Sequence, residues 1–237
     1  MPRPRGIALA IFAVALLDAA PLAAQHYQCR LPRNINLPQV QADGPPRVLP
    51  ITGYTLALSW SPEFCKPRKH RPAHARQCGG RAGLFGLVVH GLWPESGRSW
   101  PQWCPASRDP LPREAAANMC LTPSAALLAR QWAKHGACMT KRPATYFKVT
   151  HILWQGLRIP DLDRVSREKG LTAGTIRTRF IDANPDWPRE AVGVHLNARG
   201  WLEELRLCYD RGFMPTACDR RQYGARDGAE AKIWRGL

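Results

Sequence analysis

Eight cysteines constrain the fold of this chain more than any other feature. None lies in residues 1–24, which have the pattern of a secretory signal: Arg3 and Arg5 precede an apolar run from Ile7 to Leu17, and small residues follow up to Ala24. An even number of cysteines behind an export signal is typical of four disulfides formed in an oxidising compartment. The cysteines are Cys29, Cys65, Cys78, Cys104, Cys120, Cys138, Cys208 and Cys218.

Both parts of this interpretation have an alternative. The N-terminal segment would also fit an uncleaved membrane anchor, although its apolar run is shorter than a transmembrane helix requires. The cysteines could instead hold zinc, but the sequence has no CxxC pair and the spacings are wide. We therefore expect a signal peptide over residues 1–24 and a protein that is periplasmic or secreted. We expect no membrane association after signal removal, and neither a metal nor a cofactor.

The balance of charge favours a polyanionic partner. The sequence has 34 Lys and Arg against 18 Asp and Glu, a formal net charge of +16. The basic residues are spread along the chain, which fits a nucleic-acid groove but also simple solubility or adhesion to an anionic surface. Charge alone leaves these possibilities open.

The pattern of apolar residues and turn signals predicts one domain behind an N-terminal arm. Residues 25–50 hold five prolines and little periodicity, so they are expected to form an extended arm, with a single domain over residues 51–237. Because predicted helices and strands do not alternate regularly, we expect an α+β fold, with several helices packed on a mainly antiparallel sheet and disulfides holding it. The expected strands are 54–60, 84–90, 191–196 and 201–209, the helices 122–136, 144–158 and 172–183, and the loops 66–83 and 94–113.

The segment FGLVVHGLWP, residues 85–94, contains the first candidate catalytic side chain. His90 is predicted to end a buried strand, directly before Gly91, where a ligand can approach the imidazole. Its structural alternative is a histidine that caps the strand.

The segment RQWAKHGAC, residues 130–138, contains the second candidate catalytic side chain, His135. This segment covers the end of a predicted helix. Thr122 can cap that helix, Pro123 suits its first position, and Gly136 can end it. Gln131 and His135 are four residues apart and share a face. His135 could also simply stabilise a helix C-terminus. Two histidines brought together would suit RNA cleavage without metal, which needs one group to take a proton and one to give it.

Together the two segments resemble the T2 family of secreted ribonucleases, whose active-site segments run close to F-G-x-x-H-G-L-W-P and H-E-W-x-K-H-G-T-C. The first segment matches in full. The stretches LSWSPEFC, QCGG and ELRLCYD are also similar to that family, and the resemblance covers about residues 54–218. The second segment matches at Trp132, Lys134, His135, Gly136 and Cys138.

The resemblance implies the α+β fold of that family and endonucleolytic cleavage of single-stranded RNA through a 2′,3′-cyclic phosphate to 3′-phosphate ends. By position, His135 would be the base and His90 the acid, with the roles reversed in the second step. Lys134 would stabilise charge on the phosphoryl oxygens, and Trp93 would border the phosphate or base site. RNA is the expected partner of a monomer, and DNA would resist because it lacks the 2′-hydroxyl.

The resemblance also implies disulfide pairs. The family's disulfides correspond to Cys104–Cys138 and Cys208–Cys218. The other four cysteines are expected to pair among themselves, as Cys65–Cys78 and Cys29–Cys120.

Three positions depart from the family pattern: Gln131 replaces its Glu, Arg130 its first His, and Ala137 its Thr. A carboxylate beside His135 would raise the imidazole pKa and help hold the phosphorane, and the amide loses that charge. Arg130 offsets part of this loss because it can grip a phosphate through two donors. We expect an active but slow enzyme. The alternative is a catalytically weakened RNA-binding protein on the same fold.

Overall fold

The computed structural model describes residues 26–27, 29–106 and 108–236. The predicted signal peptide therefore lies outside the described residues. Within the arm, residues 29–50 form no helix or strand apart from one bridge between Arg47 and Gln102. Within the described residues, no helix is both long enough and apolar enough to span a bilayer.

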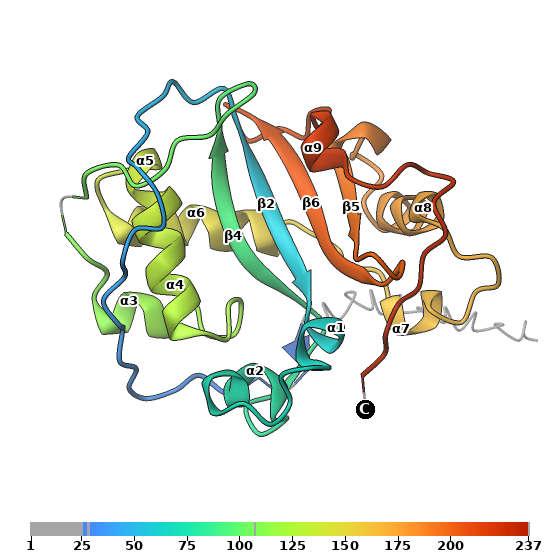
Figure 1. Cartoon of the computed structure of the whole chain (residues 1–237), viewed down its shortest axis with the longest axis horizontal. Coiled ribbons are helices and arrows are strands. Elements are labelled where there is room, and N and C mark those ends of the chain that lie inside the picture. Colours follow the sequence, from blue (N-terminus) through green and yellow to red (C-terminus); the bar gives the residue numbers. More distant parts are fainter. Residues whose placement is uncertain (1–25, 28, 107, 237) are drawn as a thin grey trace, which may run out of the picture.

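A four-stranded antiparallel sheet lies at the centre of the molecule, with strand order β4-β2-β6-β5 (Figure 1). A two-residue strand, β1 (His26–Tyr27), pairs with β3 (Leu84–Phe85). The expected α+β fold with a mainly antiparallel sheet is thus confirmed. The strands of the central sheet are β2 (Gly53–Trp60), β4 (Leu87–Glu95), β5 (Val192–Leu196) and β6 (Leu202–Asp210).

Helices lie beside both edge strands of the sheet and behind it. In Figure 1, α3, α4 and α5 lie beside β4, α6 runs behind the sheet, and α8 lies beside β5. The buried core joins them, with Trp132, Trp154, Phe180 and Leu207 almost inaccessible to solvent. The α-helices are α1 (Ser61–Cys65), α2 (Ala75–Cys78), α3 (Pro112–Ala116), α4 (Ala125–Gln131), α5 (Ala137–Met139), α6 (Pro143–Gln155), α7 (Leu162–Val165), α8 (Ala173–Ala183) and α9 (Arg220–Tyr223). The other helical turns are η1 (Pro72–His74), η2 (Trp132–Gly136) and η3 (Arg189–Ala191).

Two predicted boundaries were wrong at places that matter for the site. His90 does not end a strand, because β2 continues to pair with β4 as far as Gly53 and Glu95. Gly136 does not end a helix, because its backbone is helical and α5 follows directly. The predicted loop 66–83 also contains η1 and α2.

Four disulfides fasten the loops and the arm to this frame. Their pairs are those that were expected. They are Cys29–Cys120, Cys65–Cys78, Cys104–Cys138 and Cys208–Cys218.

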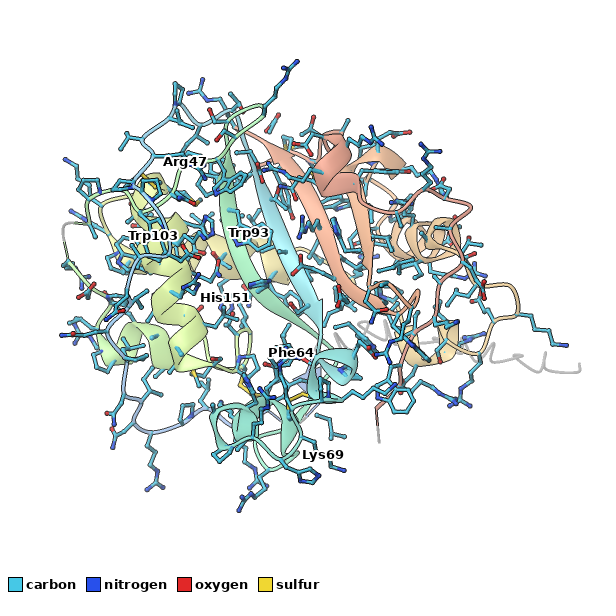
Figure 2. The ribbon with its side chains drawn as sticks, viewed as in Figure 1. Arg47, Phe64, Lys69, Trp93, Trp103 and His151 are labelled. Carbon is cyan, nitrogen blue, oxygen red and sulfur yellow. A yellow bond between two sulfur atoms is a disulfide. The ribbon has the colours of Figure 1, made fainter. Side chains whose placement is uncertain are left out.

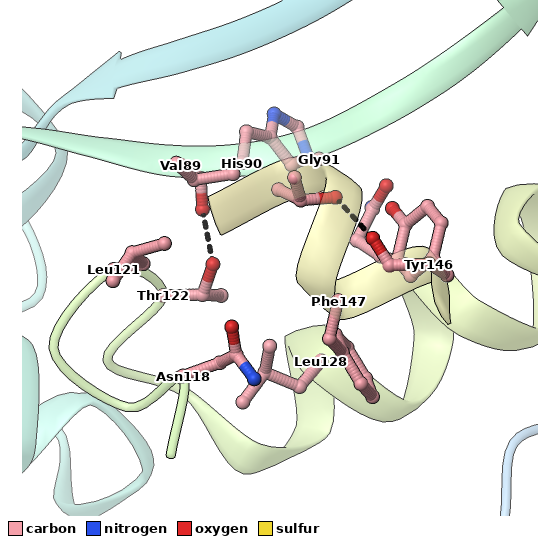
Figure 3. Close-up of a pocket in the computed structure, with 11 residues that line it drawn as sticks. Val89, His90, Gly91, Asn118, Leu121, Thr122, Leu128, Tyr146 and Phe147 are labelled. Atoms are coloured by element: carbon pink, nitrogen blue, oxygen red, sulfur yellow. Dashed lines mark hydrogen bonds between the residues drawn. The ribbon is translucent and has the colours of Figure 1, made fainter. Parts of the chain in front are cut away.

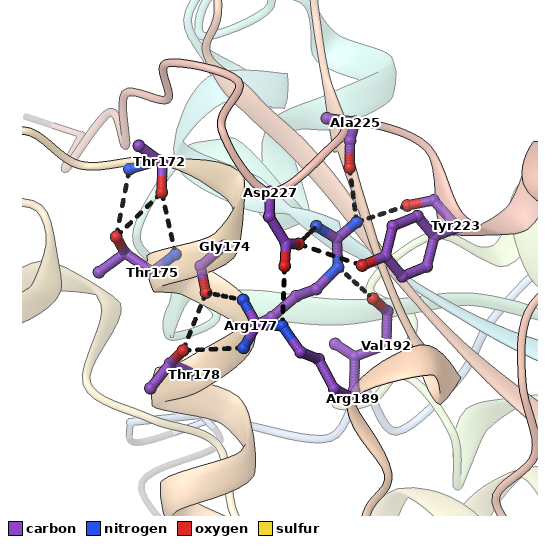
Figure 4. Close-up of polar contacts among 10 residues, drawn as sticks. All are labelled: Thr172, Gly174, Thr175, Arg177, Thr178, Arg189, Val192, Tyr223, Ala225 and Asp227. Carbon is purple, nitrogen blue, oxygen red and sulfur yellow. Dashed lines mark hydrogen bonds and ion pairs between the residues drawn. The ribbon is translucent and has the colours of Figure 1, made fainter.

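A buried arginine holds the C-terminal segment against α8 and β5 (Figure 4). The guanidinium of Arg177 is inaccessible to solvent, and it donates to Asp227 at 2.6 Å and to the Val192 carbonyl at 2.7 Å. It also donates to the carbonyls of Tyr223 and Ala225. Without the guanidinium the three carbonyls would lose this donor, although Asp227 would still accept from Arg189 and from the Tyr223 hydroxyl. Arg177 therefore helps to fix the path of residues 223–227.

Candidate active site

A β-bulge places the first histidine. Opposite β2, Val89 pairs with Leu58 and Gly91 pairs with Ala57, so His90 has no partner across the ladder. The other edge of β4 is bonded to the following loop: the Val89 amide donates to the Leu121 carbonyl at 2.8 Å. An extra residue in one strand bends that strand and re-aims its side chain. His90 is accordingly turned toward the face of the sheet that carries Glu204.

Thr122, in the same loop, does not cap α4 as predicted. The Thr122 hydroxyl donates to the Val89 carbonyl at 2.7 Å (Figure 3), and Thr122 lies two residues before the position that caps α4. Ser124 caps α4 instead by accepting from the Leu127 amide. Behind His90 this loop, α4 and α6 enclose a cavity with room for about one water molecule.

His90 has a buried carboxylate partner. Nδ1 of His90 lies 2.7 Å from Oε1 of Glu204 on β6, and the Arg206 guanidinium donates to Oε2 of the same carboxylate at 2.7 Å. Burial alone raises the pKa of Glu204, but the hydrogen bond and charge of His90, together with Arg206, outweigh it and lower the pKa to about 2. Glu204 is therefore ionised and accepts the Nδ1 proton of His90, which leaves Nε2 free.

The second histidine lies on a π-helical turn. In η2 the chain widens between α4 and α5, and both Gln131 and His135 are buried. Gly136 is required here because a Cβ atom at this position would lie 2.7 Å from the Trp132 ring and 2.8 Å from the Tyr146 ring. Glycine is therefore present at position 136 because the packing leaves no room for a side chain, and not because the helix ends there.

Trp93 connects the two histidines. Its ring centroid lies 5.1 Å from that of His90 and 5.8 Å from that of His135, and its indole N–H donates to Oε1 of Gln131 at 2.7 Å. Gly91 permits this contact, since a Cβ there would lie 2.0 Å from the same Gln131 oxygen. The structure thus brings three of the predicted site residues together around the indole of a fourth, Trp93, which is labelled in Figure 2.

His135 is kept neutral by its surroundings. Burial, followed by the positive charges of Lys134, His90 and Arg130, lowers the pKa of His135 to about 3, against a small opposing effect of Asp43. Its Nδ1 is buried without a hydrogen-bond partner among the described residues. A neutral imidazole can accept a proton at the ring nitrogen that carries no hydrogen.

The other two predicted site residues form a second group with the arm. Lys134 Nζ lies 3.0 Å from both carboxylate oxygens of Asp43, and Arg130 donates to the same carboxylate. The indole N–H of Trp103 donates to Asp43 at 3.0 Å. The hydrogen bond from Lys134 is the main cause that lowers the pKa of Asp43 to about 2.

Three residues of this arrangement were not predicted from the sequence: Glu204, Asp43 and Trp103. Glu204 lies in the ELRLCYD stretch, where strand alternation separates it from the exposed Glu203. Asp43 is the single acidic residue of the arm, residues 25–50. Within the described residues, no group of three or more His, Cys, Asp or Glu side chains is placed to hold a metal ion.

Fold and site together define an α+β protein in which a histidine on a bulged strand of an antiparallel sheet and a histidine on an adjacent helical turn lie beside one tryptophan. The model of the Ribonuclease T2 family matches residues 52–178. The fold is similar to that of trichomaglin, described as a novel S-like ribonuclease, with a TM-score of 0.59 and 21% identity over 72% of this chain and 92% of that one. The chain belongs to the ribonuclease T2 family.

Curated bacterial relatives have names consistent with this family. The chain is 29% identical over 184 residues to a protein of Haemophilus influenzae named "Probable ribonuclease". It is 30% identical over 198 residues to Ribonuclease I of Escherichia coli, and this match covers 65% of the chain and 73% of the relative. The match with the Haemophilus protein covers 73% of this chain but 62% of that protein, less than two thirds of its length.

Proposed function

We propose that this protein is an endoribonuclease that cleaves single-stranded RNA without a metal ion. The observation that carries the proposal is the approach of His90 and His135 to one indole, with their ring centroids 5.1 and 5.8 Å from that of Trp93. The electrostatics of the two histidines differ, since one is buried and neutral and the other faces a carboxylate. A buried neutral imidazole and an imidazole hydrogen-bonded to a carboxylate suit a reaction in which one group takes a proton and the other gives one.

In the first step, His135 accepts the proton of a ribose 2′-hydroxyl. The 2′-oxygen attacks the adjacent phosphorus, and the bond from phosphorus to the departing 5′-oxygen breaks. The imidazolium of His90 protonates that oxygen, and the Glu204 carboxylate balances the charge of the imidazolium. The products are a 2′,3′-cyclic phosphate and a free 5′-hydroxyl. Lys134 stabilises the charge that builds up on the phosphoryl oxygens.

In the second step the roles of the histidines reverse. His90, now neutral, accepts a proton from water, the water oxygen attacks the cyclic phosphate, and His135 protonates the departing 2′-oxygen. A 3′-phosphate end results. DNA resists because the first step requires a 2′-hydroxyl as the nucleophile.

Gln131 makes this enzyme slow. An amide can accept the Trp93 hydrogen bond as a carboxylate would, but it brings no negative charge to His135 and the neighbouring cations Lys134 and Arg130. The loss is on the order of 10- to 100-fold in rate, somewhat less than the removal of an oxyanion donor. Arg130 compensates in part by contacting the phosphate.

Four disulfides and the predicted signal peptide support a periplasmic or secreted location. The physiological partner would be RNA that reaches that compartment, bound by a monomer.

The test is incubation of the oxidised protein, without residues 1–24, with single-stranded RNA in EDTA from pH 4 to pH 9. Matched DNA controls for the 2′-hydroxyl, and a His135→Ala preparation controls for contaminating nuclease. We expect cleavage of RNA alone, with 2′,3′-cyclic phosphate ends. A folded protein that binds RNA but cleaves it at no pH would contradict this proposal.

That negative outcome would support the second candidate, a catalytically weakened RNA-binding protein. The observation that favours it is the combination of Gln131 in place of a carboxylate with a lysine that is already paired to Asp43. RNA binding without cleavage distinguishes the two functions.

A further inference from the structure

Three donors from two parts of the chain converge on one carboxylate of the arm. Lys134 Nζ lies 3.0 Å from each oxygen of Asp43, Trp103 donates its indole N–H at 3.0 Å, and Arg130 completes the group. The ammonium of Lys134 and the guanidinium of Arg130 also lie over the Trp103 ring, at 5.6 and 5.7 Å from its centroid. Two cations and a neutral N–H around one anion form a cradle that would suit a phosphate equally well.

The cradle is held in place by contacts on either side of it. The Trp103 amide donates to the Lys134 carbonyl, and the Cys104–Cys138 disulfide joins the same two segments one turn further on. The donors therefore remain together whether or not Asp43 is present.

The arm, in contrast, is attached through its backbone on both sides of Asp43, the nearest contact being a hydrogen bond from the Gln102 side chain to the Pro45 carbonyl at 2.9 Å. Cys29 is bonded to Cys120, and two backbone hydrogen bonds join Arg47 to Gln102. The Asp43 side chain itself is 43% exposed, and Gly44 follows it. The carboxylate can therefore leave the cradle without the arm leaving the domain.

We propose that Asp43 is an internal substitute for an RNA phosphate: it occupies the Lys134–Arg130–Trp103 cradle in the free protein, and a phosphodiester of the bound RNA displaces it. This inference deepens the proposed function and rests on it. The arm thus makes RNA binding weaker than the cradle alone would allow, and it keeps smaller anions away from Lys134.

The Asp43 carboxylate is displaced from the cradle by a competing anion and not by protonation at low pH. The pKa of Asp43 is held at about 2, mainly by its hydrogen bond to Lys134, so its carboxylate stays charged at pH values well below neutral. Exposed ion pairs are weak and are screened by salt. A polyanion that brings several phosphates and releases their counterions outcompetes one such carboxylate.

The test measures binding with a probe that cannot be cleaved. A 2′-O-methyl oligonucleotide keeps the phosphates and blocks the nucleophile, so its affinity is independent of any catalytic activity. Affinity is measured over a range of salt concentrations for the protein without residues 1–24 and for Asp43→Asn and Asp43→Ala. We expect both variants to bind about 3- to 10-fold tighter at low salt, and their plots of log affinity against log salt to be steeper by about one phosphate contact.

Asp182→Asn is the matched control. Asp182 is an exposed carboxylate on α8 that pairs with Arg179 at 3.3 Å, so the variant makes the same change in net charge away from the cradle. We expect its affinity to change much less than that of the Asp43 variants. Unchanged or weaker binding by both Asp43 variants, or an equal gain in Asp182→Asn, would overturn the inference. The proposed function would fail separately, by absence of RNA cleavage in the unmodified protein.

Discussion

Glu204 and His90 are joined by a hydrogen bond across the central sheet, from Nδ1 on β4 to a carboxylate oxygen on β6, with β2 between them. The bond is possible because the bulge in β4 leaves His90 outside the regular ladder. A carboxylate that holds the Nδ1 proton fixes both the tautomer and the ring orientation of a histidine.

We therefore expect Glu204→Gln to lower kcat about 10- to 100-fold with little change in KM, because Glu204 acts on His90 and not on bound RNA. Glu203→Gln is the matched control, since this neighbour is exposed and points away from His90. Steady-state kinetics on a short RNA measure both constants. A fall confined to KM, or an equal effect of both variants, would show that Glu204 does not position the acid.

Removal of either histidine should abolish cleavage. His90→Ala and His135→Ala each delete one proton-transfer group, which contributes about 10²- to 10⁴-fold to such a reaction. RNA binding should remain largely intact, because the phosphate contacts are assigned to Lys134 and Arg130. The measurement is single-turnover cleavage together with affinity for an uncleavable RNA analogue. Measurable cleavage by the double variant is the outcome that this mechanism cannot accommodate.

Gln131→Glu should raise the rate. The carboxylate can keep the hydrogen bond from Trp93, and it adds a negative charge beside His135, Lys134 and Arg130. We expect a gain of about 10-fold in kcat, within the range given for the loss of such a group, and a rise in the pKa of His135. The pH profile of kcat/KM measures the second effect. An equal or lower rate would mean that the amide is part of a rearranged site.

Burial of neutral His135 should make stability depend on pH. The folded-state pKa is about 3, whereas an ordinary histidine has a pKa of 6.5, so below pH 6.5 the unfolded chain binds a proton that the folded protein does not. The free energy of unfolding should therefore fall as pH falls from 6.5 toward 3. The contribution of His135 is about 2 kcal/mol between pH 6.5 and 4.5.

Urea unfolding at several pH values measures this dependence, with His135→Gln for comparison. The pKa values of His74 and His195 are also lowered by burial, and these histidines contribute equally to both proteins, so the difference between the two slopes isolates His135. Parallel slopes for the two proteins would contradict a buried neutral His135.

The local patterns in the sequence predicted the elements of the fold well but not their ends. Alternation found β2 and β6 and helical periodicity found α6 and α8, because burial on one face imposes those periods. His90 was placed at the end of a strand and Gly136 at the end of a helix, but His90 lies inside β4, and the helical backbone continues from η2 through Gly136 into α5. A glycine in the sequence cannot by itself distinguish the end of a helix from a position where a neighbouring ring leaves no room for a Cβ atom.

The sequence by itself determined which chemical groups the site can contain. Two segments supply His90, Trp93, Gln131, Lys134 and His135, and the resemblance that they carry implied the family, its α+β fold and two of the disulfide pairs, while the cysteine count predicted four disulfides. Only the tertiary structure decided the partners of these groups. Glu204 reaches His90 from 114 residues away, and Asp43 reaches Lys134 from 91 residues away. The physical reason is that burial and charge act through space: the pKa of His135 depends on what surrounds it in the folded protein, and no local pattern encodes that.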